Sequence, residues 1–193
     1  MKIKRFVCNA FQENAYVVSR GASCIIIDPG FAGDGNGAAG ELDGLYEYLE
    51  AEGIRPEAIL LTHTHWDHTL GVAPLVEKFG IPVISNPPDG STALGFKVIS
   101  TPGHTPDSVC YYDAAEHVLF TGDTLFAGTI GRTDLPGGNY DDEIRSIMEK
   151  LIFLPGETDI YPGHGPASTI ARERTENPFL EPFNEPEETE FEA

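Results

Sequence analysis

Four side chains of the types that bind metal ions lie within six consecutive positions of the chain: His63, His65, Asp67 and His68, in the segment LTHTHWDHTLG. Imidazole nitrogens and carboxylate oxygens suit a borderline divalent cation such as zinc, iron or manganese. For a single histidine, an idle place in a surface loop or in the core is the ordinary interpretation. At this density of ligand-type side chains, the pattern favours a metal site.

The residues around this cluster indicate where it lies in the fold. Residues 58–62 before it form a largely apolar, strand-like run, and residues 70–79 after it follow a helical pattern. One helical face cannot gather all four side chains, whereas an extended segment places His63, His65 and Asp67 on one side. We therefore expect a loop at the carboxyl end of a strand, leading into a helix, where open α/β sheets place their sites.

The motif His-x-His-x-Asp-His after a buried strand resembles the signature of the metallo-β-lactamase superfamily. The resemblance implies one or two bound metal ions and three further ligands in chain order: a histidine, an aspartate and a late histidine. The chain supplies His104 in TPGHTPDS, Asp123 in LFTGDTLF and His164 in YPGHGP. The matching region extends over about residues 1–180.

The fold implied by this resemblance is an α/β (α+β) metallo-β-lactamase-like four-layer αββα sandwich, with two mixed sheets face to face and helices outside. We expect residues 1–180 to form this domain and residues 181–193 to form an acidic, disordered tail. The glycine-rich residues 30–40 are expected to form a mobile connection near the cleft, without the spacing of a phosphate-binding loop.

Apolar alternation and turn signals place the individual elements along the chain. Strands are expected at residues 3–8, 15–19, 24–27, 58–62, 81–85, 96–100, 109–112, 118–121 and 159–161. Helices are expected from 42 to the stop at Gly53, over 70–79, and from the cap Asn139 to 151.

The superfamily's pattern also implies how the ligands are shared. It assigns His63, His65 and His104 to one metal ion, Asp67, His68 and His164 to a second, and Asp123 to a bridge between them. The carboxylates Asp67 and Asp123 are also the catalytic candidates. Zinc is the first expectation for the two divalent ions, with iron or manganese as alternatives, and such ions lower the pKa of bound water to about 7.

The leaving group is constrained by the histidine count. Five of the six histidines belong to the implied ligand set, and the sixth, His117, lies in a predicted hairpin turn. The site therefore lacks a spare imidazole as general acid. A thiolate can leave unprotonated, since the thiol pKa is about 8.5. We predict a dinuclear metal-dependent hydrolase whose metal-bound hydroxide attacks the carbonyl of a small-molecule thioester.

Within the superfamily, the chain is similar to glyoxalase II, the hydroxyacylglutathione hydrolases, in the segments FAGTIGRTDLPGG and YPGHGPASTIARERTENPF. It resembles a short form that lacks the carboxyl-terminal helical domain, since only 29 residues follow His164. Glutathione recognition is therefore not implied. Arg132 is the candidate for binding a substrate carboxylate, with an ion pair to Asp134 as the alternative, and Asp107 is a departure near the mouth.

Two other functions remain open at this stage. A mononuclear iron persulfide dioxygenase would use the positions of His63, His104 and Asp123, although retention of the other ligands argues for two metals. A non-catalytic metal-binding protein is less favoured, because structural zinc sites are closed and usually rich in cysteine.

The composition excludes several kinds of partner. Twelve basic against 31 acidic residues give a formal net charge of -19, which disfavours nucleic acid and anionic membrane surfaces. No apolar run approaches a membrane span, and we expect a cytoplasmic protein. Cys8, Cys24 and Cys110 are expected to be reduced thiols buried in strands. The oligomeric state is left open.

Overall fold

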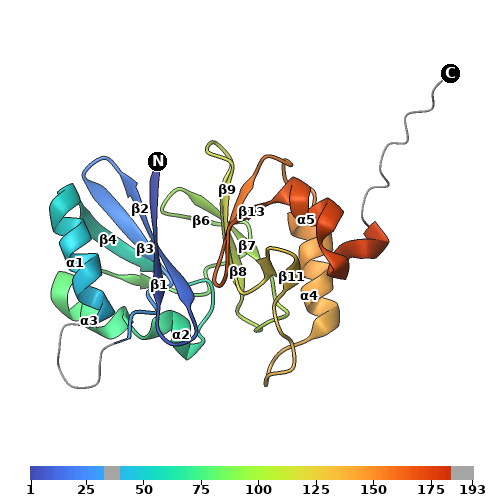
Figure 1. Cartoon of the computed structure of the whole chain (residues 1–193), viewed down its shortest axis with the longest axis horizontal. Coiled ribbons are helices and arrows are strands. Elements are labelled where there is room, and N and C mark those ends of the chain that lie inside the picture. Colours follow the sequence, from blue (N-terminus) through green and yellow to red (C-terminus); the bar gives the residue numbers. More distant parts are fainter. Residues whose placement is uncertain (33–39, 184–193) are drawn as a thin grey trace.

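The computed structural model describes residues 1–32 and 40–183. Two mixed β-sheets lie face to face, and helices cover the outer face of each (Figure 1). This arrangement confirms the predicted fold class of a four-layer αββα sandwich.

The first sheet carries the amino-terminal part of the chain. Its strands, in spatial order, are β1 (Lys2–Cys8), β2 (Glu13–Arg20), β3 (Ser23–Ile27), β4 (Arg55–Leu60) and β5 (Val83–Ile84). The first three are antiparallel neighbours, whereas β3, β4 and β5 are parallel. Two helices, α1 (Glu41–Glu52) and α3 (Val72–Phe79), pack on its outer face (Figure 1).

The second sheet carries the rest of the chain. Its strands, in spatial order, are β13 (Ser168–Thr169), β12 (Asp159–Pro162), β9 (Val118–Gly122), β8 (Val109–Asp113), β7 (Phe96–Ser100) and β6 (Thr92–Ala93). A short hairpin is formed by β10 (Leu125–Phe126) and β11 (Thr129–Ile130). The outer helices are α4 (Tyr140–Ser146), its π-helical continuation η1 (Ile147–Leu151), α5 (Ile170–Glu176) and the 3-10 helix η2 (Pro178–Phe183).

The central strands are apolar on both faces because each sheet is covered on both sides. In β3, Ile25 and Ile27 pack between the sheets, whereas Cys24 and Ile26 pack toward α1 and α3. The period of two in side-chain direction produces this division. Buried strands of this kind are near-continuous hydrophobic runs in the sequence, as the segment SCIII is.

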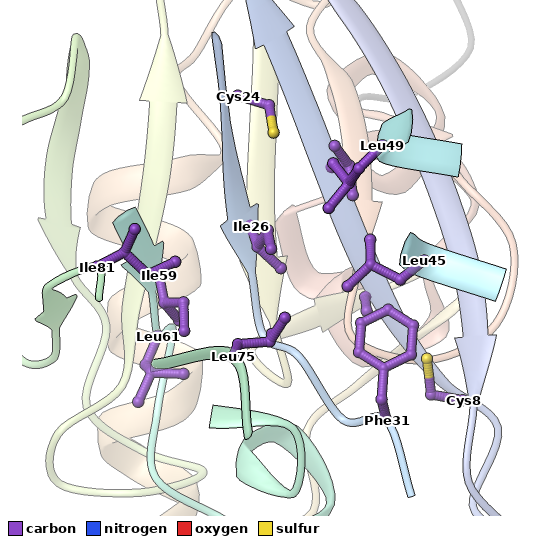
Figure 2. Packing of buried hydrophobic residues seen from close by; sticks show 12 residues of the cluster. Cys8, Cys24, Ile26, Phe31, Leu45, Leu49, Ile59, Leu61, Leu75 and Ile81 are labelled. Atoms are coloured by element: carbon purple, nitrogen blue, oxygen red, sulfur yellow. The ribbon is translucent and has the colours of Figure 1, made fainter. Parts of the chain in front are cut away.

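The core beneath α1 and α3 is closed by a residue from the loop that follows β3. Figure 2 shows Phe31 beside Leu45 of α1 and Cys8 of β1, with Leu75 of α3 below Ile26. All five side chains are almost completely buried. This packing holds the loop after β3, and therefore Asp28 within it, against the outer helices.

Most predicted elements are present, but the structure corrects the segment around the histidine cluster. A separate one-turn helix, α2 (Trp66–Thr69), begins inside the cluster, so the prediction that Asp67 lies on an extended segment is wrong. A four-residue helix shows no periodicity in the sequence, which explains the error. The strand expected at residues 81–85 is confined to β5, and β6, β10, β11 and β13 were not predicted.

Other expectations have different outcomes. The three cysteines are free and buried in β1, β3 and β8, as predicted. The described part of the expected tail, residues 181–183, belongs to η2, which corrects the start of the disordered segment. The rest of that tail and most of the glycine-rich connection lie outside the described residues, and the domain boundary stays a prediction. None of the helices in the described ranges has the length and apolarity that a membrane crossing requires.

Truncating the fully buried Leu45 to alanine should lower the free energy of unfolding by about 2–5 kcal/mol, because it removes core contacts and leaves a cavity. The exposed Glu47, on the same helix, is the matched control, and Glu47→Ala should change stability by about 0.5 kcal/mol or less. Urea unfolding of both variants measures the difference. Equal losses would show that α1 does not pack as described.

Candidate metal centre

The ligand-type residues follow strands that end at one edge of the sandwich. β7, β9 and β12 run in the same direction within the second sheet, because β8 is antiparallel to β7 and β9 and β12 is parallel to β9. His104, Asp123 and His164 come after these three strands. In the first sheet, the loop after β4 carries His63 and His65, and α2 carries Asp67 and His68.

Glycine is required where these loops meet. A Cβ atom on Gly163 would lie 2.3 Å from the Asp123 Oδ1 atom and 2.7 Å from the His68 Cε1 atom. Gly122, before Asp123, has φ of +50 and would place a Cβ 2.2 Å from the Thr62 hydroxyl. These close approaches bring the two sheets' loops together at the ligands.

Three histidines form the first group of ligand-type side chains. The ligand atoms of His63, His65 and His104 all lie within 4.8 Å of one another. The Nε2 atom of His104 is 2.9 Å from the Nδ1 atom of His65. Three neutral imidazoles in this arrangement can hold one divalent ion.

A carboxylate and two histidines form the second group. The ligand atoms of Asp67, His68 and His164 also lie within 4.8 Å of one another. The Oδ2 atom of Asp67 is 3.4 Å from the His164 Nε2 atom and 3.9 Å from the His68 Nε2 atom.

Asp123 lies between the two groups. Its Oδ2 atom is 3.6 Å from the Nε2 atoms of both His104 and His164, and its Oδ1 atom is 3.3 Å from the Nε2 atom of His68. In a tetrahedral site with bonds of about 2.0–2.1 Å, ligand atoms lie about 3.3 Å apart. The observed spacings therefore fit a pair of metal ions that share this carboxylate.

Three of the atoms that face the centre have no hydrogen-bond partner within the described protein. The Nε2 atoms of His63 and His68 and the Oδ1 atom of Asp123 are buried without a hydrogen bond. Buried polar atoms are rarely left unpaired in folded proteins. A cation at this point satisfies all three, so the donor set fits metal ions.

The opposite ring nitrogens are held by the surrounding protein. The Nδ1 atom of His63 lies 3.1 Å from Thr62 Oγ1, and that of His68 lies 3.2 Å from Asp28 Oδ2. The Nδ1 atom of His104 lies 2.7 Å from the Arg132 carbonyl oxygen, and that of His164 lies 3.1 Å from the Phe11 carbonyl oxygen. Such contacts set the tautomer and the ring orientation, which leaves Nε2 to face the ion.

The ionisable side chains of the centre shift one another's pKa values. Burial, together with His68, lowers the pKa of His63 well below its ordinary value. Burial also opposes protonation of His68, but Asp123 and Asp28 outweigh it and raise that pKa well above the ordinary value. Burial opposes ionisation of Asp123, yet the nearby His68, His63 and His164 outweigh it and lower the Asp123 pKa. A cation that binds His68 must displace its proton, so metal affinity falls as the pH is lowered.

Asp28 supports the centre, and sequence reasoning gave it no role. It is buried at φ +47, and its carboxylate accepts hydrogen bonds from the Thr62 amide at 2.7 Å and from the Thr62 hydroxyl. Asp28, His63 and His68 form a third group of ligand-type atoms within 4.8 Å. Because His68 presents Nδ1 to Asp28 and Nε2 to Asp123, Asp28 orients this histidine from outside the centre. The strand end IIIDPG was its only sequence signal.

Two buried glutamates were also missed. Glu143 of α4 accepts a hydrogen bond from the His104 amide at 2.8 Å, and burial raises its pKa to about 8. The Oε1 atom of Glu13, in β2, lies 3.8 Å from the His68 Nδ1 atom. Burial raises the pKa of Glu13 well above its ordinary value. Neither glutamate is close in sequence to a ligand, so no spacing rule could find them.

The remaining predicted residues lie at the periphery. The Arg132 guanidinium donates to both carboxylate oxygens of Asp134 at 2.8 and 2.9 Å, which is the ion pair weighed as its alternative role. Its role in substrate binding stays a prediction. Asp107 accepts a hydrogen bond from the Thr64 hydroxyl at 2.9 Å. His117 lies between β8 and β9, at the opposite end of β9 from Asp123.

A cavity of about 700 Å³ opens onto the centre. The ligands that line it are His65, Asp67, His104, Asp123 and His164. Its other walls are largely apolar, and include Phe11, Trp66, Phe126, Ile130 and Leu135. A cleft with a few convergent polar groups and apolar walls is the form of a small-molecule site.

Comparison with known proteins shows the family. The family model of the metallo-beta-lactamase superfamily matches residues 8–97 and 91–164. The chain belongs to the metallo-β-lactamase superfamily. Among similar proteins, a probable metallo-hydrolase, YqgX, of Bacillus subtilis is 35% identical over 95% of this chain and 100% of its own. The hydroxyacylglutathione hydrolase GloC of Haemophilus influenzae is 30% identical over 93% of this chain and 98% of its own.

Solved structures of this superfamily have the same fold. The B3 metallo-β-lactamase BLEG-1 has a TM-score of 0.84 at 35% identity, covering 93% of this chain and 99% of its own. TTHA1623, in a di-iron-bound form, has a TM-score of 0.83 at 35% identity, covering 92% and 100%. ETHE1 from Myxococcus xanthus has a TM-score of 0.81 at 26% identity, covering 97% and 93%.

Replacing Asp28 by asparagine should weaken metal binding about 10–100-fold, because the variant keeps the shape and the tolerated positive φ but loses the charge that orients His68. Titration of the metal-stripped protein with zinc against a chromophoric chelator measures the affinities. Asp89→Asn is the matched control, since Asp89 also accepts from a backbone amide but lies on an exposed loop. An unchanged zinc affinity in Asp28→Asn would show that Asp28 does not support metal binding.

Proposed function

We propose that this protein is a dinuclear metal-dependent hydrolase of thioesters, of the hydroxyacylglutathione hydrolase kind in reaction type. The observation that carries the proposal is that two groups of ligand-type side chains flank Asp123 and that members of both groups line a single cavity. GloC, which has a related sequence, is a hydroxyacylglutathione hydrolase by name. In the reaction, water adds to the carbonyl carbon, the carbon–sulfur bond breaks, and the products are a carboxylate, a thiol and one released proton.

The chain's own residues divide the work. We assign His63, His65 and His104 to one ion and Asp67, His68 and His164 to the other, with Asp123 between them. When bound, two divalent ions supply a nucleophile from water at neutral pH and polarise the carbonyl oxygen. The carboxylates of Asp67 and Asp123 offset part of the cationic charge and orient the histidines that they face.

No histidine among the described residues of the cavity lining is left over to act as a general acid, which favours a thioester. Among the described residues that line the cavity, every histidine belongs to the ligand groups, and His117 lies at the far end of β9. An amide or alkyl phosphate leaving group needs a proton from a general acid. A thiolate needs none, because its conjugate thiol has a pKa of about 8.5.

A mononuclear iron persulfide dioxygenase is the second candidate, because two of the three residues that it would use, His104 and Asp123, lie with Nε2 and Oδ2 only 3.6 Å apart. It would use His63, His104 and Asp123 alone. The intact second group, Asp67, His68 and His164, favours the dinuclear hydrolase, since a single ion leaves that group without a function. The di-iron-bound form of TTHA1623 shows that a similar chain holds two irons, so iron remains an alternative to zinc here.

We further propose that the substrate is a small molecule, without nucleic acid or membrane as partner, and that the enzyme is cytoplasmic. The net charge of -19 supports the first part. The three free, buried cysteines fit a reducing compartment.

The deciding measurement is metal content by elemental analysis together with hydrolysis of two thioesters, S-lactoylglutathione and S-octanoyl-N-acetylcysteamine, of a β-lactam and of an alkyl phosphodiester. About two ions per chain and selective thioester turnover are expected, and chelation should abolish that turnover. One iron, no hydrolysis, and oxygen consumption with glutathione persulfide would establish the dioxygenase. Comparable rates on the phosphodiester and the thioester would contradict the leaving-group argument.

Asp67→Asn separates the two candidates within one protein. In a dinuclear hydrolase, it should reduce the metal content toward one ion and lower kcat/KM for the thioester about 100-fold or more, because the second ion loses its anionic ligand. In the dioxygenase, oxygen consumption would persist. The control is Asp107→Asn, which changes a carboxylate that accepts a hydrogen bond from Thr64 and does not line the cavity. This variant should keep both ions.

A further inference from the structure

Two aromatic side chains stand exposed at the mouth of the cavity. Phe11 and Trp66 are 58% and 55% exposed, and their rings form an edge-to-face pair with centroids 4.9 Å apart. They come from opposite parts of the site, the β1–β2 turn and α2, and both line the cavity. Large exposed aromatic surface beside a cleft marks a binding surface.

This aromatic pair is attached directly to the metal centre. The Phe11 carbonyl accepts a hydrogen bond from the His164 Nδ1 atom, and Trp66 lies between His65 and Asp67 in the chain. Any group bound at the centre therefore lies next to the pair.

Asn9 holds the turn in this position. Its side-chain amide donates to the carbonyls of Gly30 and Asp67, each at 2.9 Å, and its oxygen accepts from the Phe11 amide at 2.9 Å. Asn9 has φ of +51, a conformation that asparagine tolerates better than most residues. The aromatic pair is thus built into the site by specific backbone contacts.

The facing wall continues the apolar surface. Phe126, Ile130 and Leu135 line the same cavity, and the Phe126 ring lies 6.3 Å from the His164 ring. Arg132 lines the cavity, but its exposed guanidinium already donates to both carboxylate oxygens of Asp134. A multiply anionic thiol such as glutathione finds no unpaired cation among the described lining residues, and the whole chain is strongly acidic.

We propose that the aromatic pair selects thioesters with an uncharged, apolar acyl chain, and that glutathione is not the recognised thiol. This inference rests on the proposed thioester hydrolysis and names its substrate class. The acyl chain suits the apolar wall because it stays neutral throughout the reaction. The leaving sulfur gains charge, and an apolar surface would destabilise it.

Binding can be measured without turnover, because Trp66 is the single tryptophan of the chain. The probes are S-(2-oxooctyl)-N-acetylcysteamine and its 2-oxopropyl homologue, in which a methylene separates the carbonyl from the sulfur. S-(2-oxopropyl)glutathione tests the thiol. Trp66 fluorescence of the zinc-loaded protein should show the octyl analogue binding at least about tenfold more tightly than the propyl one, since each buried methylene contributes about fourfold.

Phe11→Ala should reduce that octyl-to-propyl ratio about tenfold, because it removes half of the aromatic pair but keeps the backbone carbonyl that holds His164. Phe153→Ala is the matched control, since Phe153 is 80% exposed and does not line the cavity. It should leave the ratio unchanged. Equal metal content in all three proteins shows that the centre is intact.

The last measurement is kcat/KM for hydrolysis of N-acetylcysteamine thioesters whose acyl chains range from acetyl to octanoyl. S-lactoylglutathione is included as the glutathione thioester for comparison. A rise of kcat/KM with chain length supports the inference. A flat series, no chain-length effect on binding, or preference for the glutathione compounds overturns it and leaves thioester hydrolysis standing. Tight binding of the octyl analogue without hydrolysis of any thioester would instead overturn the proposed function, while the binding of an apolar chain at the aromatic pair would still hold.

Discussion

The electrostatic cost of burying many ligand-type side chains together is the constraint on which this structure depends. Asp123 is held within 4 Å of three histidines, and its Oδ1 atom and the Nε2 atoms of His63 and His68 are buried without a hydrogen bond. In water-excluded surroundings, unpaired charges and donors are strongly unfavourable. Metal ions bound at the centre would offset that cost, so that the same ions would serve both the stability of this region and its chemistry.

The fold meets this constraint by bringing the carboxyl ends of distant strands to one edge and supporting the loops there from behind. The His164 loop is tied to the other sheet by Asn14, whose side chain donates to the Pro162 and Gly165 carbonyls, and by the Tyr16 hydroxyl, which also donates to Pro162. Glu143 supports the His104 loop from α4. The two sheets thus act as a rigid base on which the centre is assembled.

Chemistry and selectivity come from different parts of the site. The ligand-type groups sit at strand ends, and the superfamily to which the chain belongs includes similar proteins named as a B3 metallo-β-lactamase and as a hydroxyacylglutathione hydrolase. The walls of the cavity come from the β1–β2 turn, α2 and the loops around β10 and β11. Loops of this kind change without disturbing the core, which is why the acyl preference is inferred from Phe11 and Trp66 and not from the ligands.

The sequence alone determined the features that depend on neighbouring residues. Strands such as β3 and β9 were predictable because two-sided burial produces continuous apolar runs. The cluster at residues 63–68 was recognised by its density of ligand-type side chains, and His104, Asp123 and His164 by the resemblance to the superfamily. The tertiary structure alone decided the rest. Asp28 approaches His68 across 40 residues of chain, Glu143 approaches His104 across 39, and Phe11 meets His164 across 153. Periodicity describes only which face of an element a residue occupies, whereas these contacts arise when separate elements pack, and the aromatic mouth of the cavity arises in the same way.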